Sequence, residues 1–79
     1  MELKDTVDLM LSEDYKDRLK AEYYQLKIRI EKLEAAIKGC ESGEIKLDSP
    51  MELFRQQLDY MINYKGILEQ RASYEGVTF

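Results

Sequence analysis

Residues 15–40 read YKDRLKAEYYQLKIRIEKLEAAIKGC, and this stretch decides the fold. Within it, apolar side chains recur in alternating steps of four and three residues, at Leu19, Tyr23, Leu26, Ile30, Leu33 and Ile37. Because successive residues of an α-helix lie about 100° apart around its axis, these positions form one narrow apolar seam. The spacing therefore predicts a long amphipathic helix, which we expect to extend over residues 12–38.

A second helix is predicted over residues 50–73. Ser49, Pro50 and Glu52 match an N-cap, a proline at the first helical position and the glutamate of a capping box. Apolar residues recur here with the same spacing of four and three residues, interrupted by Lys65, at Met51, Phe54, Leu58, Met61, Leu68 and Ala72. Two long helices joined by a loop of roughly ten residues favour an antiparallel hairpin. The predicted fold class is all-α.

The other segments complete a single domain over residues 1–79. Residues 1–11 are expected to form a short helix or an ordered arm, and residues 74–79 a tail. Gly39 and Gly43 indicate that the first long helix stops at residue 38 and that residues 39–49 form the loop. Ser12 is expected to cap that helix, with Glu13 and Asp14 placing negative charge at its positive end.

A second apolar stripe on the later helix predicts self-association. It lies roughly opposite the first seam, includes Arg71, and consists otherwise of Leu53, Tyr60, Tyr64, Ile67 and Tyr74. A two-helix hairpin buries only one face of each helix, and a chain of 79 residues buries little apolar surface on its own. We therefore expect a homo-oligomer.

The composition argues against several classes of protein. The chain has no histidine and a single cysteine, Cys40, so neither a disulfide nor a tetrahedral zinc site is expected. No segment approaches the roughly 20 apolar residues that cross a bilayer, and acids stand where a secretory signal needs positive charge. Motifs for phosphate-binding loops or activated serines are also missing. We expect a cytoplasmic protein that is not an enzyme, needs no cofactor and does not bind a membrane.

Charge is distributed unevenly along the chain. Seven of the twelve Lys and Arg residues lie in residues 15–40 against four acids, so this stretch carries +3 while the rest sums to −7 and the net charge is −4. Lys16, Lys20, Lys27 and Lys38 fall within roughly 40° of one another around the helix. Ammonium groups beside tyrosine rings suit a ligand with phosphates and bases. In the alternative interpretation, the lysine stems only cover apolar surface.

The negative net charge of the chain also affects which anionic ligands it can bind. A pI near 4.8 disfavours duplex nucleic acid, whereas a small anionic ligand avoids most of the repulsion. Glu31 and Glu34 stand three residues apart, as paired catalytic carboxylates can. Lys27 and Lys38 each lie four residues from one of them, which favours ordinary salt bridges along the helix instead.

Two segments carry a resemblance to a known family: residues 5–37, DTVDLMLSEDYKDRLKAEYYQLKIRIEKLEAAI, and residues 53–79, LFRQQLDYMINYKGILEQRASYEGVTF. They resemble small crAss-phage-related proteins of phages and prophages. That family is similar in turn to the helical-hairpin sponges with which phages defeat CBASS and Thoeris immunity. Those sponges are homo-oligomers, often hexamers, that bind cyclic oligonucleotides or cyclic ADP-ribose isomers between protomers without degrading them.

The resemblance implies a phage or prophage protein that sequesters a cyclic nucleotide signal in the cytoplasm of its bacterial host. In DRLKAE, Lys20 matches a lysine that contacts nucleotide in the anti-CBASS branch, and Arg55 in LFRQQL corresponds to a basic residue of its second helix. The aromatic residue which that branch uses upstream of its first long helix has no counterpart near Asp5.

The candidate ligand-binding residues combine both lines of reasoning. Lysines are expected to face phosphates, Arg55 to add a bidentate contact and tyrosines to stack on bases. The set is Lys16, Lys20, Tyr23, Tyr24, Lys27, Arg55 and Tyr60. The alternative function is a small protein-interaction module that covers a host or phage protein with its tyrosine stripe.

Overall fold

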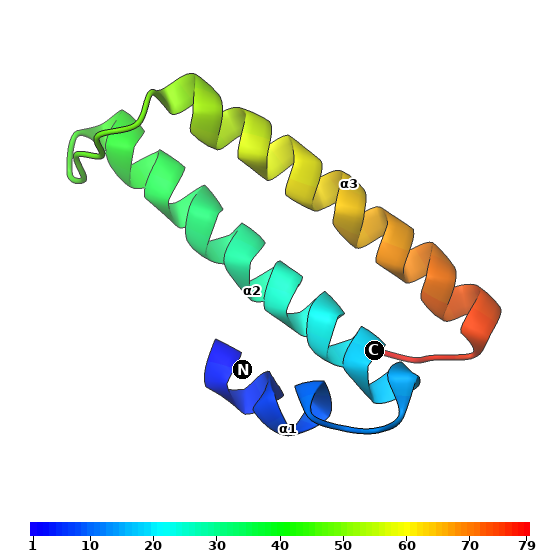
Figure 1. The fold of residues 1–79 in the computed structure, drawn as a ribbon. Helices are drawn as coiled ribbons and strands as arrows, with labels where there is room; N and C mark the ends of the chain where they lie inside the picture. The colour runs from blue at the N-terminus through cyan, green and yellow to red at the C-terminus, as the bar shows by residue number, and fades with distance from the viewer.

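A computed structural model describes residues 1–79, and every regular element in it is helical (Figure 1). A short 3₁₀ turn, η1 (Leu3–Thr6), leads into the single-turn helix α1 (Val7–Met10). Two long helices follow, α2 (Tyr15–Ser42) and α3 (Met51–Glu75), which run antiparallel as a hairpin. The prediction of an all-α chain with two packed helices is confirmed.

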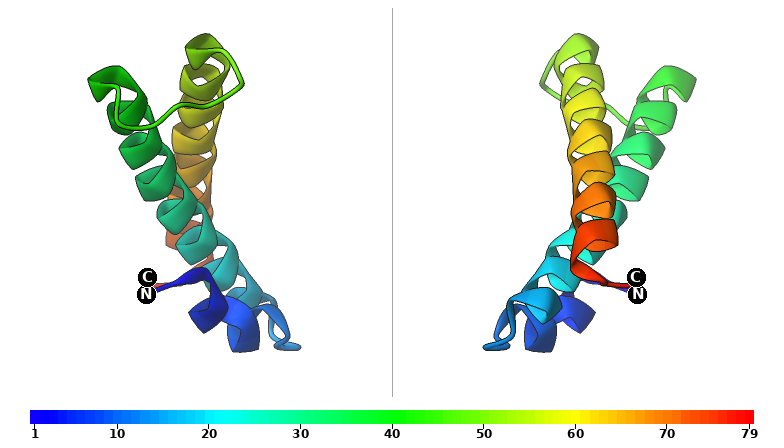
Figure 2. Two further views of the ribbon diagram at one scale, coloured as in Figure 1. Left: turned by 90° about the vertical axis from the view of Figure 1, so that its left-hand side faces the viewer. Right: turned by 90° about the vertical axis from the view of Figure 1, so that its right-hand side faces the viewer.

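The core lies between α2 and α3, where the predicted seam of α2 is buried. The core cluster consists of five buried residues, four from α2 and one from α3: Leu19, Tyr23, Leu26, Ile30 and Leu68. Leu58 and Met61 of α3 pack against this cluster from the middle of the hairpin. The two helix axes are inclined to one another, so the helices draw apart toward the loop that joins them (Figure 2). The hairpin is therefore best packed in the half that holds the start of α2 and the end of α3.

The start of α2 differs from the prediction. Asp14, and not Ser12, is the N-cap, and its side chain accepts a 2.9 Å hydrogen bond from the Lys16 amide. The Ser12 hydroxyl instead donates to Asp17 Oδ2 at 2.8 Å and accepts from the Asp14 amide at 3.1 Å. Ser12 thus shapes the turn before the helix, and the longer aspartate side chain satisfies the free amide of the first turn.

The end of α2 also differs from the prediction. The helix does not stop at residue 38 but continues through Gly39 to Ser42, and Gly43 ends it in the left-handed conformation at φ 82°. The loop chain then folds back, because the Gly39 carbonyl accepts hydrogen bonds from the amides of Glu44 and Ile45 at 2.9 and 3.0 Å. Gly39 leaves room for the Ile45 side chain, so this glycine serves packing and not termination.

The predicted capping box of the second helix is wrong. Pro50 itself occupies the N-cap position of α3, and no side chain caps the helix there. The Pro50 carbonyl accepts the Leu53 amide at 3.1 Å, which begins the helix without help from Ser49 or Glu52. α3 continues two residues beyond the predicted end to Glu75, and Gly76 closes it at φ 69°.

Two terminal segments pack back onto the hairpin. The Val77 amide donates to the Ala72 carbonyl at 2.9 Å, and this turn brings Phe79 onto α2. At the other end, η1 and α1 lie along α2 (Figures 1 and 2). Thr6 is fully buried there, and Gln25 Nε2 of α2 donates to its hydroxyl at 2.9 Å and also contacts Met10 Sδ. α2 is therefore covered along two of its sides.

None of the helices combines the length and apolar character that crossing a membrane requires.

Candidate functional site

Lys16, Lys20, Lys27 and Lys38 of α2, which we call the basic stripe, make no ion pairs. The structure contains three ion pairs, which join Lys4 to Glu2, Arg55 to Glu41 and Arg71 to Glu75. The salt bridges predicted from Lys27 to Glu31 and from Lys38 to Glu34 are therefore absent. The stripe lies on α2 between the core seam and the side that holds the N-terminal segment. Its ammonium groups are not neutralised within the chain, so their charge is available to an anionic ligand.

Three aromatic rings form a cluster beside this stripe. The Tyr23 and Phe79 rings are stacked with centroids 3.7 Å apart and an interplanar angle of 4°. Tyr24 meets both rings edge to face, at centroid distances of 6.0 and 6.1 Å. Lys20 precedes the two tyrosines by one helical turn and Lys27 follows them by one turn. Two unpaired cations thus bracket an aromatic cluster along one helix.

A pocket opens next to Tyr24. It has a volume of about 210 Å³ and is lined by Met1, Tyr24, Lys27, Ile28 and Glu31. The pocket offers an aromatic ring, an apolar floor, one cation and one carboxylate. An ammonium group can hold a phosphate, whereas a carboxylate accepts hydrogen bonds from ribose hydroxyls or base amino groups. This chemistry suits part of a nucleotide, since the volume is below the range of roughly 300–1,000 Å³ typical of complete ligand pockets.

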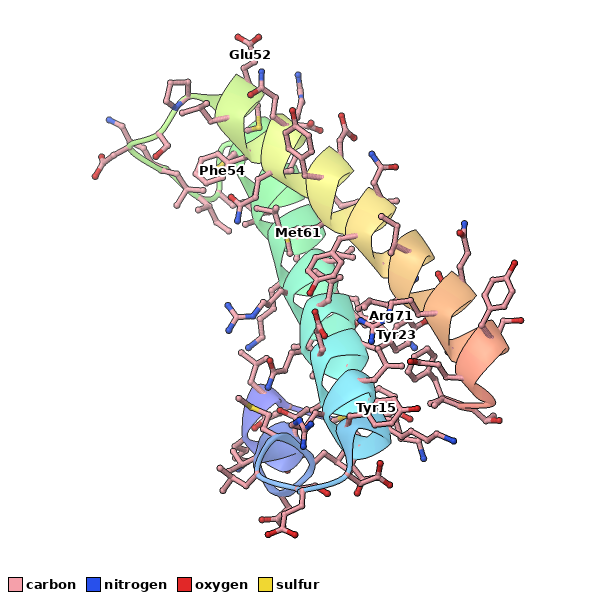
Figure 3. All side chains as sticks on the ribbon, turned by 45° about the vertical axis from the view of Figure 1, so that its right-hand side comes forward. Tyr15, Tyr23, Glu52, Phe54, Met61 and Arg71 are labelled. Atoms are coloured by element: carbon pink, nitrogen blue, oxygen red, sulfur yellow. The ribbon has the colours of Figure 1, made fainter.

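The structure separates the two tyrosines that the sequence placed together. Tyr23 points to α3 (Figure 3), is buried in the core and has one ring face covered by Phe79. Tyr24 is only half-buried and lines the pocket. Tyr24 is therefore the residue of the pair whose ring can meet a ligand, while Tyr23 holds it from behind.

Two other candidate residues lie far from this pocket. Arg55 is ion-paired with Glu41 at 3.0 Å, near the loop end of the hairpin. At a rise of 1.5 Å per residue, Glu41 lies about 30 Å along α2 from Lys20. Tyr60 of α3 is 74% exposed and lines no pocket with the residues of α2. Lys16, by contrast, stands one turn before Lys20 on the same stripe. One chain thus brings together Lys16, Lys20, Tyr24 and Lys27.

The pocket adds three residues that the sequence reasoning did not select, Met1, Ile28 and Glu31. For two of them a signal exists: Tyr24, Ile28 and Glu31 follow one another in steps of four and three, so they share a face of α2. Met1 reaches the pocket only through the packing of η1 and α1, which no local pattern reveals.

The fold and the site define a small helical hairpin whose first long helix carries an unpaired basic surface beside an aromatic cluster. The chain belongs to the Sequestin family, whose model matches residues 13–74, from the turn before α2 almost to the end of α3. No curated protein and no solved structure matches the chain.

Proposed function

We propose that this chain binds and sequesters a cyclic nucleotide signal without altering it, as an anti-defence protein of a phage or prophage in its bacterial host. The observation that carries the proposal is the arrangement on α2, where Lys20 and Lys27 lack ion-pair partners and bracket the aromatic cluster. The name of the Sequestin family points to sequestration, which agrees with a protein that binds and does not react.

The site accounts for a compact, phosphate-bearing ligand. Lys27 and Lys20 hold phosphates, and the accessible ring of Tyr24 stacks on a base. Glu31 accepts hydrogen bonds from the sugar or the base at the floor formed by Ile28. A cyclic oligonucleotide or a cyclic ADP-ribose isomer presents phosphates and bases within such a short span, whereas a long nucleic acid would also meet the acids that give the chain its net charge of −4.

A retention experiment tests the proposal. The purified chain is incubated with a panel of cyclic dinucleotides, cyclic trinucleotides and cyclic ADP-ribose isomers, washed free of unbound compound, and heated to release what it holds. Chromatography of the released fraction should recover one ligand class intact. Recovery of a changed compound would indicate an enzyme, and retention of nothing would leave the protein-interaction module as the better hypothesis.

Alanine variants locate the site. Lys20→Ala and Lys27→Ala each remove one charge-assisted contact, which should weaken retention about ten- to a hundredfold. Lys46→Ala, which removes the same charge from the loop, is the matched control and should leave the Kd unchanged. Tyr24→Ala should weaken binding about five- to a hundredfold through lost stacking, whereas Tyr15→Ala at the start of α2 should not. An unchanged Kd in both Lys20→Ala and Lys27→Ala would exclude this stripe.

A further inference from the structure

A second groove lies on the other side of α2 from the basic stripe. It is lined by one residue of η1, three of α2 and two of α3: Leu3, Arg29, Lys32, Leu33, Gln57 and Met61. At about 100° per residue, Arg29 and Lys32 lie roughly 160° around α2 from the centre of the stripe. The volume of about 330 Å³ exceeds that of each of the other two pockets. This groove is therefore separate from the pocket at Tyr24.

The two cations of the groove have no acid to neutralise them. Neither makes an ion pair, and no Asp or Glu lines the groove. No acid stands three or four residues from Arg29 or Lys32, whereas every other Lys and Arg of α2 and α3 has an acid at that spacing in the sequence. The two cations are themselves three residues apart, so they repel each other on the helix surface. In a chain with 16 acids and 12 bases, the groove thus keeps two uncompensated positive charges.

The remaining lining is mostly aliphatic. Leu3, Leu33 and Met61 are half-buried, so each still exposes part of its side chain. Met61 points from α3 toward α2 (Figure 3) and packs against the core cluster, which fixes this wall of the groove. The lining contains no aromatic ring on which a base could stack and no carboxylate that could bind ribose hydroxyls. The pocket at Tyr24 has both, so the groove suits an aliphatic body and not a nucleoside.

A carboxylate is the anion that fits this position best. Arg29 and Lys32 stand in the middle of α2, where the backbone amides are already bonded within the helix. The groove therefore lacks the free amides of a helix N-terminus, which commonly bind phosphates. A guanidinium presents a planar fork of donors that matches the two oxygens of a carboxylate, and an ammonium adds a second positive charge. Gln57 of α3 can donate a further hydrogen bond from its amide.

The volume of the groove limits the length of the aliphatic body. At about 30 Å³ for each small group, the share of one molecule in liquid water, the groove holds about ten nonhydrogen atoms. A fatty acid of about eight carbons has this size. We propose that the groove binds a medium-chain aliphatic carboxylate, with the carboxylate between Arg29 and Lys32 and the chain over the three aliphatic side chains.

Calorimetric titration with octanoate tests the ligand class. Octanoate should bind about tenfold or more tightly than 1-octanol, which has the chain without the charge, and than acetate, which has the charge without the chain. From butanoate to octanoate, each added methylene should lower the Kd about three- to fourfold. No binding of octanoate at millimolar concentration, or equal binding of octanoate and octanol, overturns the proposal. Binding of octyl phosphate but not octanoate overturns the choice of a carboxylate.

Charge-removing variants test the position. Arg29→Gln combined with Lys32→Gln removes both cations of the groove and should raise the Kd for octanoate about tenfold or more. Lys46→Gln combined with Arg55→Gln removes the same charge near the loop and should leave that Kd unchanged. All four residues are exposed, so both double variants should keep the helical circular dichroism of the unaltered chain. Equal weakening by the two double variants would indicate a general attraction to positive charge and would overturn the site.

This inference does not depend on the proposed nucleotide ligand. Because the groove and the pocket at Tyr24 lie on different sides of α2, Arg29→Gln combined with Lys32→Gln should leave nucleotide retention unchanged. A loss of nucleotide retention in that variant would assign the groove to the nucleotide and overturn the proposal. A chain that binds octanoate but retains no nucleotide would refute only the proposed function, and the reverse result would refute only the carboxylate site.

Discussion

The two long helices are nearly equal in length but differ sharply in how they are covered. α2 has 28 residues and buries eight of them, whereas α3 has 25 and buries only Leu68 and Ala72. The reason is that α2 packs against α3 on one side and against η1 and α1 on another, while α3 contacts α2 alone. The comparison shows that α2 is held from two sides, whereas α3 is held from one side and leaves most of its surface exposed.

This difference assigns separate roles to the two helices. α2 is fixed from two directions, so its remaining side can present lysines and Tyr24 in a constant geometry, as a preorganised binding site needs. α3 is fixed from one direction, so most of its side chains are left exposed. Each of the following variants tests whether the helices are as unequal as their burial indicates.

The largest effect is expected from Leu68→Ala, which empties the one large position that α3 buries completely. Leu68 is 1% exposed and contacts the core cluster of α2. Its truncation should lower the free energy of unfolding by about 2–5 kcal/mol, measured by urea denaturation at a fixed chain concentration. Ile62→Ala, on the exposed surface of α3, should cost less than about 1 kcal/mol. If both variants lost a similar free energy of unfolding, burial of α3 on one side only would be contradicted.

The second side of α2 is tested by Gln25→Ala. Its amide donates to the buried Thr6 hydroxyl, so the substitution removes a contact that holds η1 and α1 on the helix. The loss should be about 1–2 kcal/mol, with faster proteolysis within residues 1–14. Gln70→Ala, an exposed amide on α3, is the control and should change neither quantity. Unaltered proteolysis in Gln25→Ala would mean that the N-terminal segment is held by other contacts.

The hairpin was predictable from sequence because its signal is local and repeated. Leu19, Leu26 and Ile30 recur with helical spacing, and burial follows directly from that spacing. Helix ends were predicted less well, since several residues compete to satisfy the same few amides. Asp14 displaced Ser12 as the cap, and Gly39, read as a stop, proved to be a packing site for Ile45. Neither the choice of cap nor the packing at Gly39 can be predicted from local sequence, because both depend on how the adjacent turn or loop folds back onto α2.

The candidate site was predictable only where it lies on one helix. Lys20, Tyr24 and Lys27 are related by helical spacing, so the sequence alone places them on one stripe. Phe79 covers Tyr23 because the chain turns back at Gly76 after α3 ends. This contact joins residues far apart in the sequence, so helical spacing does not predict it.

A smaller effect is expected where the two helices begin. Asp14 caps α2 with its side chain, whereas α3 starts at Pro50 without a side-chain cap. Asp14→Ala should therefore lower stability by about 1 kcal/mol, as measured by thermal or urea unfolding. Asp48→Ala removes the same charge from the loop before α3, where it makes no hydrogen bond, and should have no such effect. Equal losses would show that general charge and not capping is responsible.

The smallest effect comes from one substitution made in both helices, Gly39→Ala in α2 and Gly66→Ala in α3. At Gly66 an added Cβ meets no atom within 4 Å, so alanine only improves helix propensity and should stabilise the chain by about 0.5–1 kcal/mol. At Gly39 the same Cβ would lie 2.8 Å from Ile45 Cγ1 and still closer to Ile45 Cδ1. Ile45 must then leave α2, and this loss should cancel or exceed the gain in propensity.

The pair of glycine variants separates local preference from packing, because the residue change and the helical setting are the same. Opposite signs in urea denaturation would follow from the crowding of α2 by the loop and the open surrounding of Gly66 in α3. If both variants stabilise the chain equally, Ile45 moves without cost. The loop end of α2 would then be as sparsely packed as α3, and the inequality of the two helices would be confined to the half of the hairpin that holds Leu68.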